Sequence, residues 1–177
     1  KSEFNFKLFV RTNERGLASA QIKGFAEATG DFLGTIDVNS YEAILHFPIL
    51  AKKLNEGFDI AVLSRYVSGG GDERIFMRKI ASKAIYQVSK FFFQIPFKDY
   101  GSGIFLMKKN LLVYTKNILT SYAEWFIEFI YIIYKKKYNI IEVPYVQKKD
   151  DNLSKSKSSD NIFIFIYLAI IYFLRII

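Results

Sequence analysis

The chain has 177 residues, of which 51% are hydrophobic and 18% aromatic, and its formal net charge is +8 at pH 7. This length suffices for one domain with a sizeable apolar core, and the basic balance suits an anionic partner such as nucleic acid, anionic lipid or a phosphorylated substrate. Because the chain has no cysteine and a single histidine, His46, the sequence excludes disulfides, thiolate metal sites and His-rich metal sites.

The first half of the chain alternates between apolar runs and amphipathic segments. The apolar runs, each of which predicts a short strand, are residues 6–10, 32–36 and 58–63. A helix is predicted from Gly16, with Gly30 as its stop signal, and Pro48 favours the start of a second helix that ends before Gly57. This order of strands and helices predicts an α/β fold in three layers, with helices on the faces of a mainly parallel sheet.

The second half begins with a polar, glycine-rich loop over residues 64–71. A long helix is then predicted over residues 74–93, with an apolar stripe at helical spacing that we interpret as part of the core. The stripe consists of Met77, Ile80, Ala81, Ala84, Val88, Phe91 and Phe92. The later elements predicted are a strand at 104–107, a helix at 124–134 and a strand at 138–145. Pro144 favours an edge position or a strand end for the last of these.

The last part of the chain changes character at about residue 160. A charged loop over residues 148–160 leads into residues 162–174, which are apolar without interruption. This run is shorter than the roughly 20 residues of a membrane span, so we interpret it as the start of a span or as a helix lying in the membrane interface. A core helix is a third alternative, which the absence of a polar face disfavours. We therefore predict one domain over residues 1–160 and a membrane-associated helix over residues 161–177, at the cytoplasmic face of a membrane.

Two polar residues follow the predicted strand 32–36. Asp37 and Asn39 close this strand at its carboxyl end, which is the end at which open α/β sheets bind ligands. Oxygen donors in an Asp-x-Asp-like arrangement can hold a divalent cation, which in turn can hold a diphosphate. A loop Asp and Asn that form a turn are the alternative, and these two residues alone do not decide between a cation site and a turn.

Short motifs along the chain occur in one order and with a consistent spacing. They are Asn13-x-Arg15-Gly16-Leu17, Gly30-Asp31, Asp37-Val38-Asn39, Ser64-Arg65-Tyr66, Gly69-Gly70, Arg78, Ser82, Asp99-x-x-Ser102-Gly103, Glu128, Glu142-Val143-Pro144 and Ser154-Lys155. The ordered set resembles family 2 glycosyltransferases of the dolichol-phosphate mannose synthase type over about residues 6–160. The resemblance implies a GT-A fold whose first nucleotide-binding strand is missing here. It also implies a nucleotide-sugar donor, a divalent cation (Mg²⁺ or Mn²⁺), a polyprenyl-phosphate acceptor and inverting transfer.

The resemblance assigns metal ligands to the loop after residue 36. Asp37 matches the first acid of the family's Asp-x-Asp, which contacts metal and diphosphate, and Asn39 stands where the second acid belongs. Tyr41 falls where some members have a Gln that also reaches the metal. Because Asn39 is a neutral ligand, this metal site would be one negative charge poorer than the family's.

Other positions match residues that contact phosphates in the family. Arg65 and Arg78 resemble arginines of an acceptor loop, whereas Lys149 replaces an arginine, which keeps the charge but loses the bidentate fork. The residues for which donor or phosphate contacts are implied are Asp31, Asp37, Arg65, Lys149, Ser154 and Lys155. The residues expected to act in catalysis are Asp37, Arg65, Arg78 and Asp99. Asp99 would be the general base for a hydroxyl acceptor, although an Asp before glycine also commonly forms a turn.

Three further interpretations compete with a lipid-phosphate glycosyltransferase. Asn39 and Lys149 favour a degraded homologue that acts as a scaffold, and a saccharide hydroxyl is an alternative acceptor. A nucleic-acid-binding protein fits the net charge, but the aromatic residues lie in apolar runs rather than between the cations, which disfavours base stacking. We therefore expect a nucleotide-sugar donor, a lipid-phosphate acceptor and a membrane surface as partners, and no nucleic acid.

Overall fold

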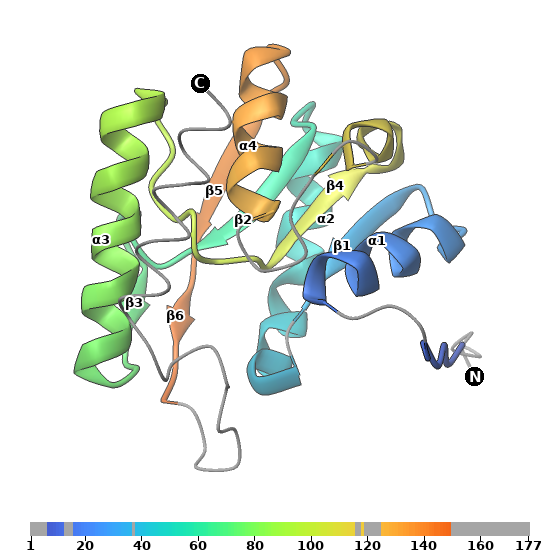
Figure 1. Ribbon diagram of the computed structural model, residues 1–177. Coiled ribbons are helices and arrows are strands. Elements are labelled where there is room, and N and C mark those ends of the chain that lie inside the picture. Colours follow the sequence, from blue (N-terminus) through green and yellow to red (C-terminus); the bar gives the residue numbers. More distant parts are fainter. Residues whose placement is uncertain (1–6, 13–15, 37, 116–117, 119–124, 150–177) are drawn as a thin grey trace.

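The computed structural model describes an α/β arrangement around a four-stranded sheet (Figure 1). The residues it describes are 7–12, 16–36, 38–115, 118 and 125–149. The sheet has the order β1-β4-β2-β5, with bounds β1 Phe32–Thr35, β2 Ile60–Ser64, β4 Phe105–Lys108 and β5 Ile140–Pro144. Strand β4 runs antiparallel to both of its neighbours, whereas β2 and β5 pair in parallel. The sheet is therefore mixed, and the prediction of a mainly parallel sheet is wrong. The prediction failed because short apolar runs do not encode the direction of a strand.

Helices and two shorter strands complete the described part of the chain. The α-helices are α1 Leu17–Glu27, α2 Phe47–Asn55, α3 Phe76–Phe93 and α4 Trp125–Lys135. Two 3₁₀ segments, η1 and η2, span Val38–His46 and Lys109–Thr115. Strands β3 (Gly71–Asp72) and β6 (Val146–Gln147) pair in parallel as a second, two-stranded sheet. The predicted helices are thus confirmed with shifts of a few residues, while the 3₁₀ segments and the small sheet were not predicted.

Residues of β2 alternate between two apolar clusters, one on each face of the main sheet. Ile60 and Val62 belong to the cluster that contains buried residues of α1 and α4, whereas Ala61 and Leu63 belong to the cluster that contains buried residues of α2. Successive side chains of a strand point to opposite faces, so this alternation places helices on both sides of the sheet. The predicted layers are present in this sense.

Aromatic packing joins α4 to the sheet. The rings of Phe105 and Phe126 stack with centroids 5.1 Å apart, and the single tryptophan, Trp125, packs beside them. The indole N–H of Trp125 donates to the Gln21 side chain (2.7 Å), whose amide donates to the hydroxyl of Thr35 (2.6 Å). This partly buried polar path connects α4, α1 and the last residue of β1.

Two predictions from the sequence are corrected by this structure. The described residues 7–10 of the predicted first strand are irregular, since they have no partner strand in the described part of the chain. The interpretation of the α3 stripe as core is wrong for its exposed members, because α3 packs inward through another side. These members are Met77, Ile80, Phe91 and Phe92. Pro144, in contrast, is the last residue of an edge strand, as predicted.

The membrane-associated helix predicted at residues 161–177 lies outside the described residues, as does the predicted boundary at residue 160. Within the described ranges, no helix combines the length and the apolar composition needed to cross a bilayer. The 18-residue helix α3 is the longest element that the structure describes.

Candidate functional site

The carboxyl ends of β1 and β2 lie at the same end of the main sheet, which we call its carboxyl edge. Thr35 and Val62 are both paired with Phe105, the first residue of β4, and both strands run antiparallel to β4. The loop of residues 99–103, which leads into β4, therefore meets the residue that follows β2, Arg65. Strand β1 continues toward Asp37 at this same edge, although Asp37 itself lies outside the described residues.

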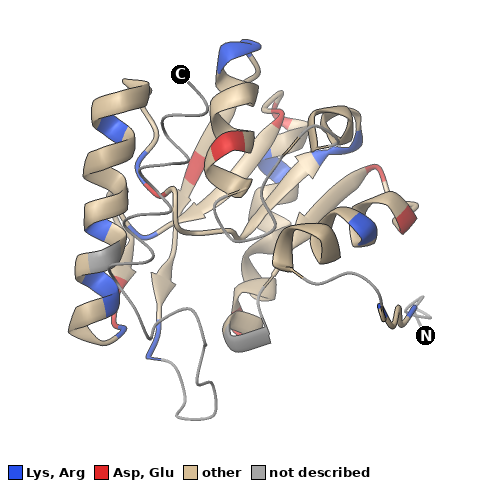
Figure 2. Ribbon diagram, viewed as in Figure 1, with Lys and Arg blue, Asp and Glu red and all other residues tan. Residues whose placement is uncertain are grey.

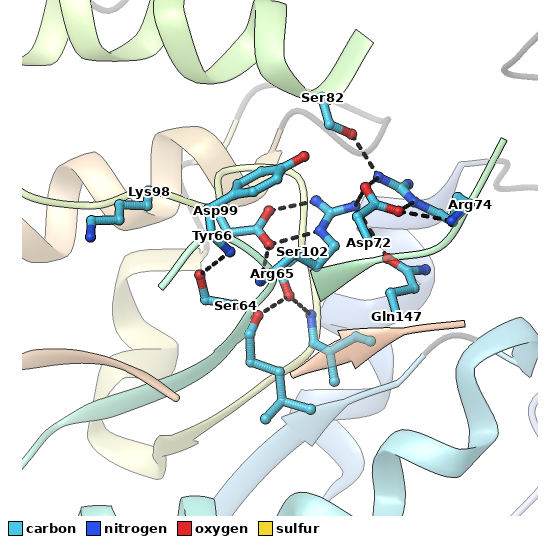
Figure 3. Close-up of polar contacts among 12 residues, drawn as sticks. Ser64, Arg65, Tyr66, Asp72, Arg74, Ser82, Lys98, Asp99, Ser102 and Gln147 are labelled. Atoms are coloured by element: carbon cyan, nitrogen blue, oxygen red, sulfur yellow. Dashed lines mark hydrogen bonds and ion pairs between the residues drawn. The ribbon is translucent and has the colours of Figure 1, made fainter. Parts of the chain in front are cut away.

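A buried ion pair between Arg65 and Asp99 forms the centre of the site (Figure 3). The backbone N–H and Nε of Arg65 each donate to Oδ2 of Asp99 at 2.8 Å, and Nη2 donates to Oδ1. Both side chains are almost fully buried, with 2% and 0% of their surface exposed. Burial alone would lower the pKa of Arg65, but the hydrogen bonds and charge of Asp99 outweigh it and raise that pKa, so the guanidinium stays charged.

A second arginine–carboxylate pair lies next to the first. Asp72 accepts from Nε and Nη2 of Arg74 at 2.9 and 2.7 Å, and its Oδ2 lies 3.8 Å from Nη1 of Arg65. Burial raises the pKa of Asp72, but the hydrogen bonds from Arg74 outweigh this effect and lower the pKa below its ordinary value. Gln147 accepts from Nη1 of Arg65 at 3.2 Å, and Arg74 also donates to Ser82 at 2.9 Å. We refer to Arg65, Asp99, Asp72 and Arg74 as the four-charge cluster.

Glycine at position 70 lets the chain fold back on the end of β2. A Cβ there would lie 2.6 Å from the carbonyl oxygen of Ser64 and 2.8 Å from that of Arg65, both of which are backbone atoms. The next residue starts β3, and its N–H donates to the carbonyl of Tyr145 at 3.1 Å. This close return brings Asp72 against Arg65 and explains why the loop needs glycine.

The loop that carries Asp99 is held from two strands. Ser102 donates its hydroxyl to the carbonyl of Leu63 in β2, and Glu142 in β5 accepts the backbone N–H groups of Lys98 and Asp99 at 2.9 and 3.0 Å. Burial raises the pKa of Glu142 despite these hydrogen bonds. The Asp99 turn predicted as an alternative is present, and Asp99 also takes part in the charged pair.

The structure brings two predicted site residues together, places Asp31 apart from them, and shows two others exposed to solvent. Arg65 and Asp99 form the central pair, while Asp31 precedes β1 at the opposite edge of the sheet, where its carbonyl accepts the N–H of Lys109. Tyr41 is exposed in η1, and Lys149 is exposed two residues beyond β6. The position of Asp31 gives no support to a role in binding phosphate beside Arg65.

Arg78 lies in the first turn of α3, one turn before Ser82, the residue that receives a hydrogen bond from Arg74. It is thus carried by the helix that borders the four-charge cluster. The predicted residues Asp37, Ser154 and Lys155, together with the side chain of Asn39, lie outside what the structure describes.

Sequence reasoning did not assign roles to four residues of this site. Asp72 and Arg74 stand between the glycine loop and α3, and their i, i+2 spacing is the signal that could have suggested a pair. Glu142 stands out in the sequence only as part of a motif, and Gln147 carries no signal. Each of these residues acts through a contact with a distant segment, which a local pattern does not reveal.

The described residues contain no group of three acidic or histidine side chains able to hold a metal ion. Asp99 and Asp72 are committed to arginines, so they are not free cation ligands. In the sequence, Asp37 and Asn39 follow β1, and their carboxylate and amide oxygens are hard ligands of the kind that Mg²⁺ and Mn²⁺ accept. The donor types therefore fit such an ion, while the exposed phenol of Tyr41 is a weak candidate.

Comparison with known proteins gives a consistent result. A family model described as "Glycosyl transferase family 2" matches residues 1–116. A dolichol-phosphate mannosyltransferase of Pyrococcus furiosus is 37% identical over 116 residues, which make up 63% of this chain and 32% of that protein. A protein of the same name from Saccharomyces cerevisiae is 37% identical over 87 residues, 46% of this chain and 31% of that protein. The match thus spans about a third of the length of these relatives.

Proposed function

This chain belongs to glycosyl transferase family 2, and we propose that it transfers a sugar with inversion from a nucleotide-diphosphate sugar to a polyprenyl phosphate. Membership of the family implies the GT-A fold, with which the observed α/β layers are compatible. The names of the two relatives favour mannose as the sugar and dolichyl phosphate as the acceptor. The reaction would take place at the cytoplasmic face of a membrane.

The four-charge cluster at the carboxyl edge of β2 is the observation that carries this proposal. When a sugar leaves a nucleotide diphosphate, negative charge grows on the leaving phosphates, and fixed cations lower the energy of that charge. Arg65 is held by Asp99 and by the close return at Gly70, so its guanidinium has one orientation before any ligand arrives. Because Arg65 is 2% exposed and paired with Asp99 and Gln147, it would bind a phosphate oxygen only once part of this pairing opens, and its position at the strand end is what the pairing fixes in advance.

The buried pairing of Asp99 with Arg65 favours a phosphate acceptor over a hydroxyl acceptor. A hydroxyl nucleophile needs a general base within hydrogen-bonding reach, and Asp99 was the acid predicted for that role. Its two oxygens accept three hydrogen bonds from Arg65 in a fully buried position, so it could accept a proton only after the ion pair opens. A phosphate monoester is largely ionised at neutral pH, with a second pKa of about 6, and needs positioning rather than deprotonation.

We assign the divalent cation, Mg²⁺ or Mn²⁺, to the loop after β1. When bound there, the cation would supply positive charge to the donor diphosphate. Asp37 would hold it through its carboxylate and Asn39 through its amide oxygen, while Arg65 binds and orients phosphate oxygens from the neighbouring strand end. Lys149, Ser154 and Lys155 are further proposed phosphate contacts.

The proposal is tested with membranes from cells that express the complete gene. Each of several radiolabelled nucleotide sugars is incubated with a polyprenyl phosphate, with Mg²⁺ or Mn²⁺, and the organic phase is analysed for labelled lipid. We expect one donor to give a sugar linked to the lipid phosphate, and Asp37→Ala to abolish this product. Label transferred to a saccharide instead would support a hydroxyl acceptor. No transfer and no donor hydrolysis with any donor would support a scaffold.

A further inference from the structure

Arg65 donates three hydrogen bonds to Asp99 and one to Gln147. The backbone N–H, Nε and Nη2 of Arg65 are all taken by Asp99, whereas Nη1 donates to the side-chain oxygen of Gln147 at 3.2 Å. Nη1 also lies 3.8 Å from Oδ2 of Asp72, which is longer than an ordinary hydrogen bond. A neutral amide oxygen attracts a guanidinium less strongly than a carboxylate does. Nη1 is therefore the guanidinium nitrogen that is held least tightly.

The backbone of Gln147 is fixed, while its side chain bridges two segments (Figure 3). Gln147 pairs with Asp72 in the β3–β6 sheet, and its carbonyl accepts the N–H of Glu73 at 2.8 Å. A guanidinium has donors only, so the amide must turn its oxygen to Arg65. Its NH₂ group is thus left to donate to the hydroxyl of Ser40 in η1, at 3.5 Å. These contacts give the amide one orientation.

The side chain of Gln147 lies closer to solvent than that of Asp99. Gln147 is partly exposed, whereas the side chain of Asp99 has no exposed surface. The next two residues, Lys148 and Lys149, are exposed, and Figure 2 shows basic residues at this end of β6 and at several levels of α3. Fixed cations raise the local concentration of anions. An anion that arrives from solvent would therefore meet Nη1 of Arg65 before it meets the bonds to Asp99.

We infer that Gln147 is the exchangeable partner of Arg65, and that a phosphate oxygen takes the place of its amide oxygen on Nη1. The bonds from Arg65 to Asp99 would stay closed during this exchange, so the guanidinium keeps its place while one nitrogen changes partner. Gln147 is then a positioning residue, because it acts through Arg65. That the phosphate belongs to a sugar donor or a lipid acceptor rests on the proposed function, whereas the exchange requires only an anion with phosphate oxygens.

Substitutions of Gln147 should change the affinity for such an anion in opposite directions. Gln147→Ala leaves Nη1 without this acceptor, so an anion no longer displaces a hydrogen bond and should bind about three- to tenfold more tightly. Gln147→Glu places a carboxylate at Nη1 and a further negative charge beside Asp72, so it should weaken binding by about tenfold or more. Loss of a residue that only stabilised the fold would not raise the affinity for an anion.

Isothermal titration calorimetry with inorganic pyrophosphate measures these affinities on the full chain, in a buffer freed of divalent cations. Pyrophosphate has the phosphate oxygens of the proposed leaving group but no sugar, base or lipid. Asn139→Asp is the matched control for charge, since Asn139 is exposed and precedes β5, whereas Gln147 follows it. Circular dichroism verifies that each variant is folded, and Gln147→Ser, whose side chain is too short to reach Nη1, replaces Gln147→Ala if that variant does not fold.

We expect Gln147→Ala to bind pyrophosphate most tightly, the unmodified chain less tightly and Gln147→Glu least, with Asn139→Asp close to the unmodified chain. Three results would overturn the inference. They are affinities that change in the same direction or not at all in the two Gln147 variants, no binding to Gln147→Ala, and an equal loss in Asn139→Asp and Gln147→Glu. If the expected order holds but no sugar is transferred to lipid, the proposed function fails while the exchange stands.

Discussion

The carboxylate of Asp99 accepts three hydrogen bonds from Arg65, one of them from the backbone N–H that directly follows β2. The side chain of Arg65 is thus tied to the loop before β4, and its backbone is tied to the same group. Removing either partner would leave a buried charge without its counter-charge, which is far more costly than losing an exposed ion pair.

We expect Asp99→Ala to lower the free energy of unfolding by about 3–5 kcal/mol, because Arg65 would stay buried without its main partner. Arg65→Lys should also destabilise, since an ammonium cannot reproduce the two parallel N–H donors. Chemical denaturation of the purified chain measures both effects. Lys23→Ala, which removes an exposed pair with Glu27, is the control and should cause no measurable change. If Asp99→Ala behaved like Lys23→Ala, the buried pair would not exist in solution.

Two Gly→Ala substitutions distinguish a glycine that is required because backbone atoms lie close to it from a glycine whose replacement changes only the entropy of the unfolded chain. Gly70→Ala places a Cβ 2.6 Å from a backbone oxygen, so it should destabilise by about 1–3 kcal/mol and reduce transfer by displacing Arg65. Gly24→Ala in α1 meets no atom within 4 Å and should stabilise by about 0.5–1 kcal/mol. Thermal melts and transfer assays on both variants give the comparison. Equal stability changes at the two positions would contradict the tight return after β2.

The raised pKa of Glu142 predicts a pH dependence with a defined sign. Burial raises this pKa above its ordinary value of 4.5, so the folded state holds the proton more tightly than the unfolded state. The stability that protonation contributes is fully present below pH 4.5 and is lost as the pH rises through the folded-state pKa. Glu142→Gln cannot ionise, so the difference in unfolding free energy, wild type minus variant, should fall as the pH rises above 4.5.

Urea denaturation of both proteins over a series of pH values measures that difference, in which other titrating groups largely cancel. A difference that does not change with pH would contradict the assignment. Because Glu142 positions the loop of Asp99, the variant should also lower the rate of transfer without changing the affinity for metal.

The loop after β1 is predicted to set the metal requirement. Asp37→Ala should reduce transfer by about 100-fold or more, since it removes the only acid proposed as a ligand. Asn39→Asp adds a charged oxygen and should lower the concentration of Mg²⁺ or Mn²⁺ that gives half-maximal activity. Titration of activity against each ion, with the full-length protein, measures both changes. Normal metal-dependent turnover by Asp37→Ala would exclude this loop as the metal site.

Local patterns were sufficient to predict most of the elements. The apolar runs that became β1, β2 and β4 and the helical spacing of α3 are properties of neighbouring residues, so they can be read from the sequence. The direction of β4 could not be predicted, because it depends on how the long connection through α3 returns to the sheet.

The candidate site was predictable only in part. Arg65 and Asp99 could be selected separately, as residues that follow strands or fill motifs, but they are 34 positions apart and their pairing is a tertiary contact. The exposure of Ile80 illustrates the same limit, since an apolar stripe on a helix does not show whether a core or another surface covers it. Both the pairing of Arg65 with Asp99 and the exposure of Ile80 are decided by contacts between residues that are far apart in the sequence.

The hydrogen-bonded path from Trp125 through Gln21 to Thr35 gives the protein a built-in optical reporter. Trp125 is the only tryptophan, it is buried, and Thr35 ends the strand that leads to Asp37. Indole emission depends on the polarity and hydrogen bonding around the ring. We therefore expect a rearrangement at the end of β1 to reach a single chromophore through two hydrogen bonds, so that the proposed binding of donor or cation would be followed by intrinsic fluorescence without any label.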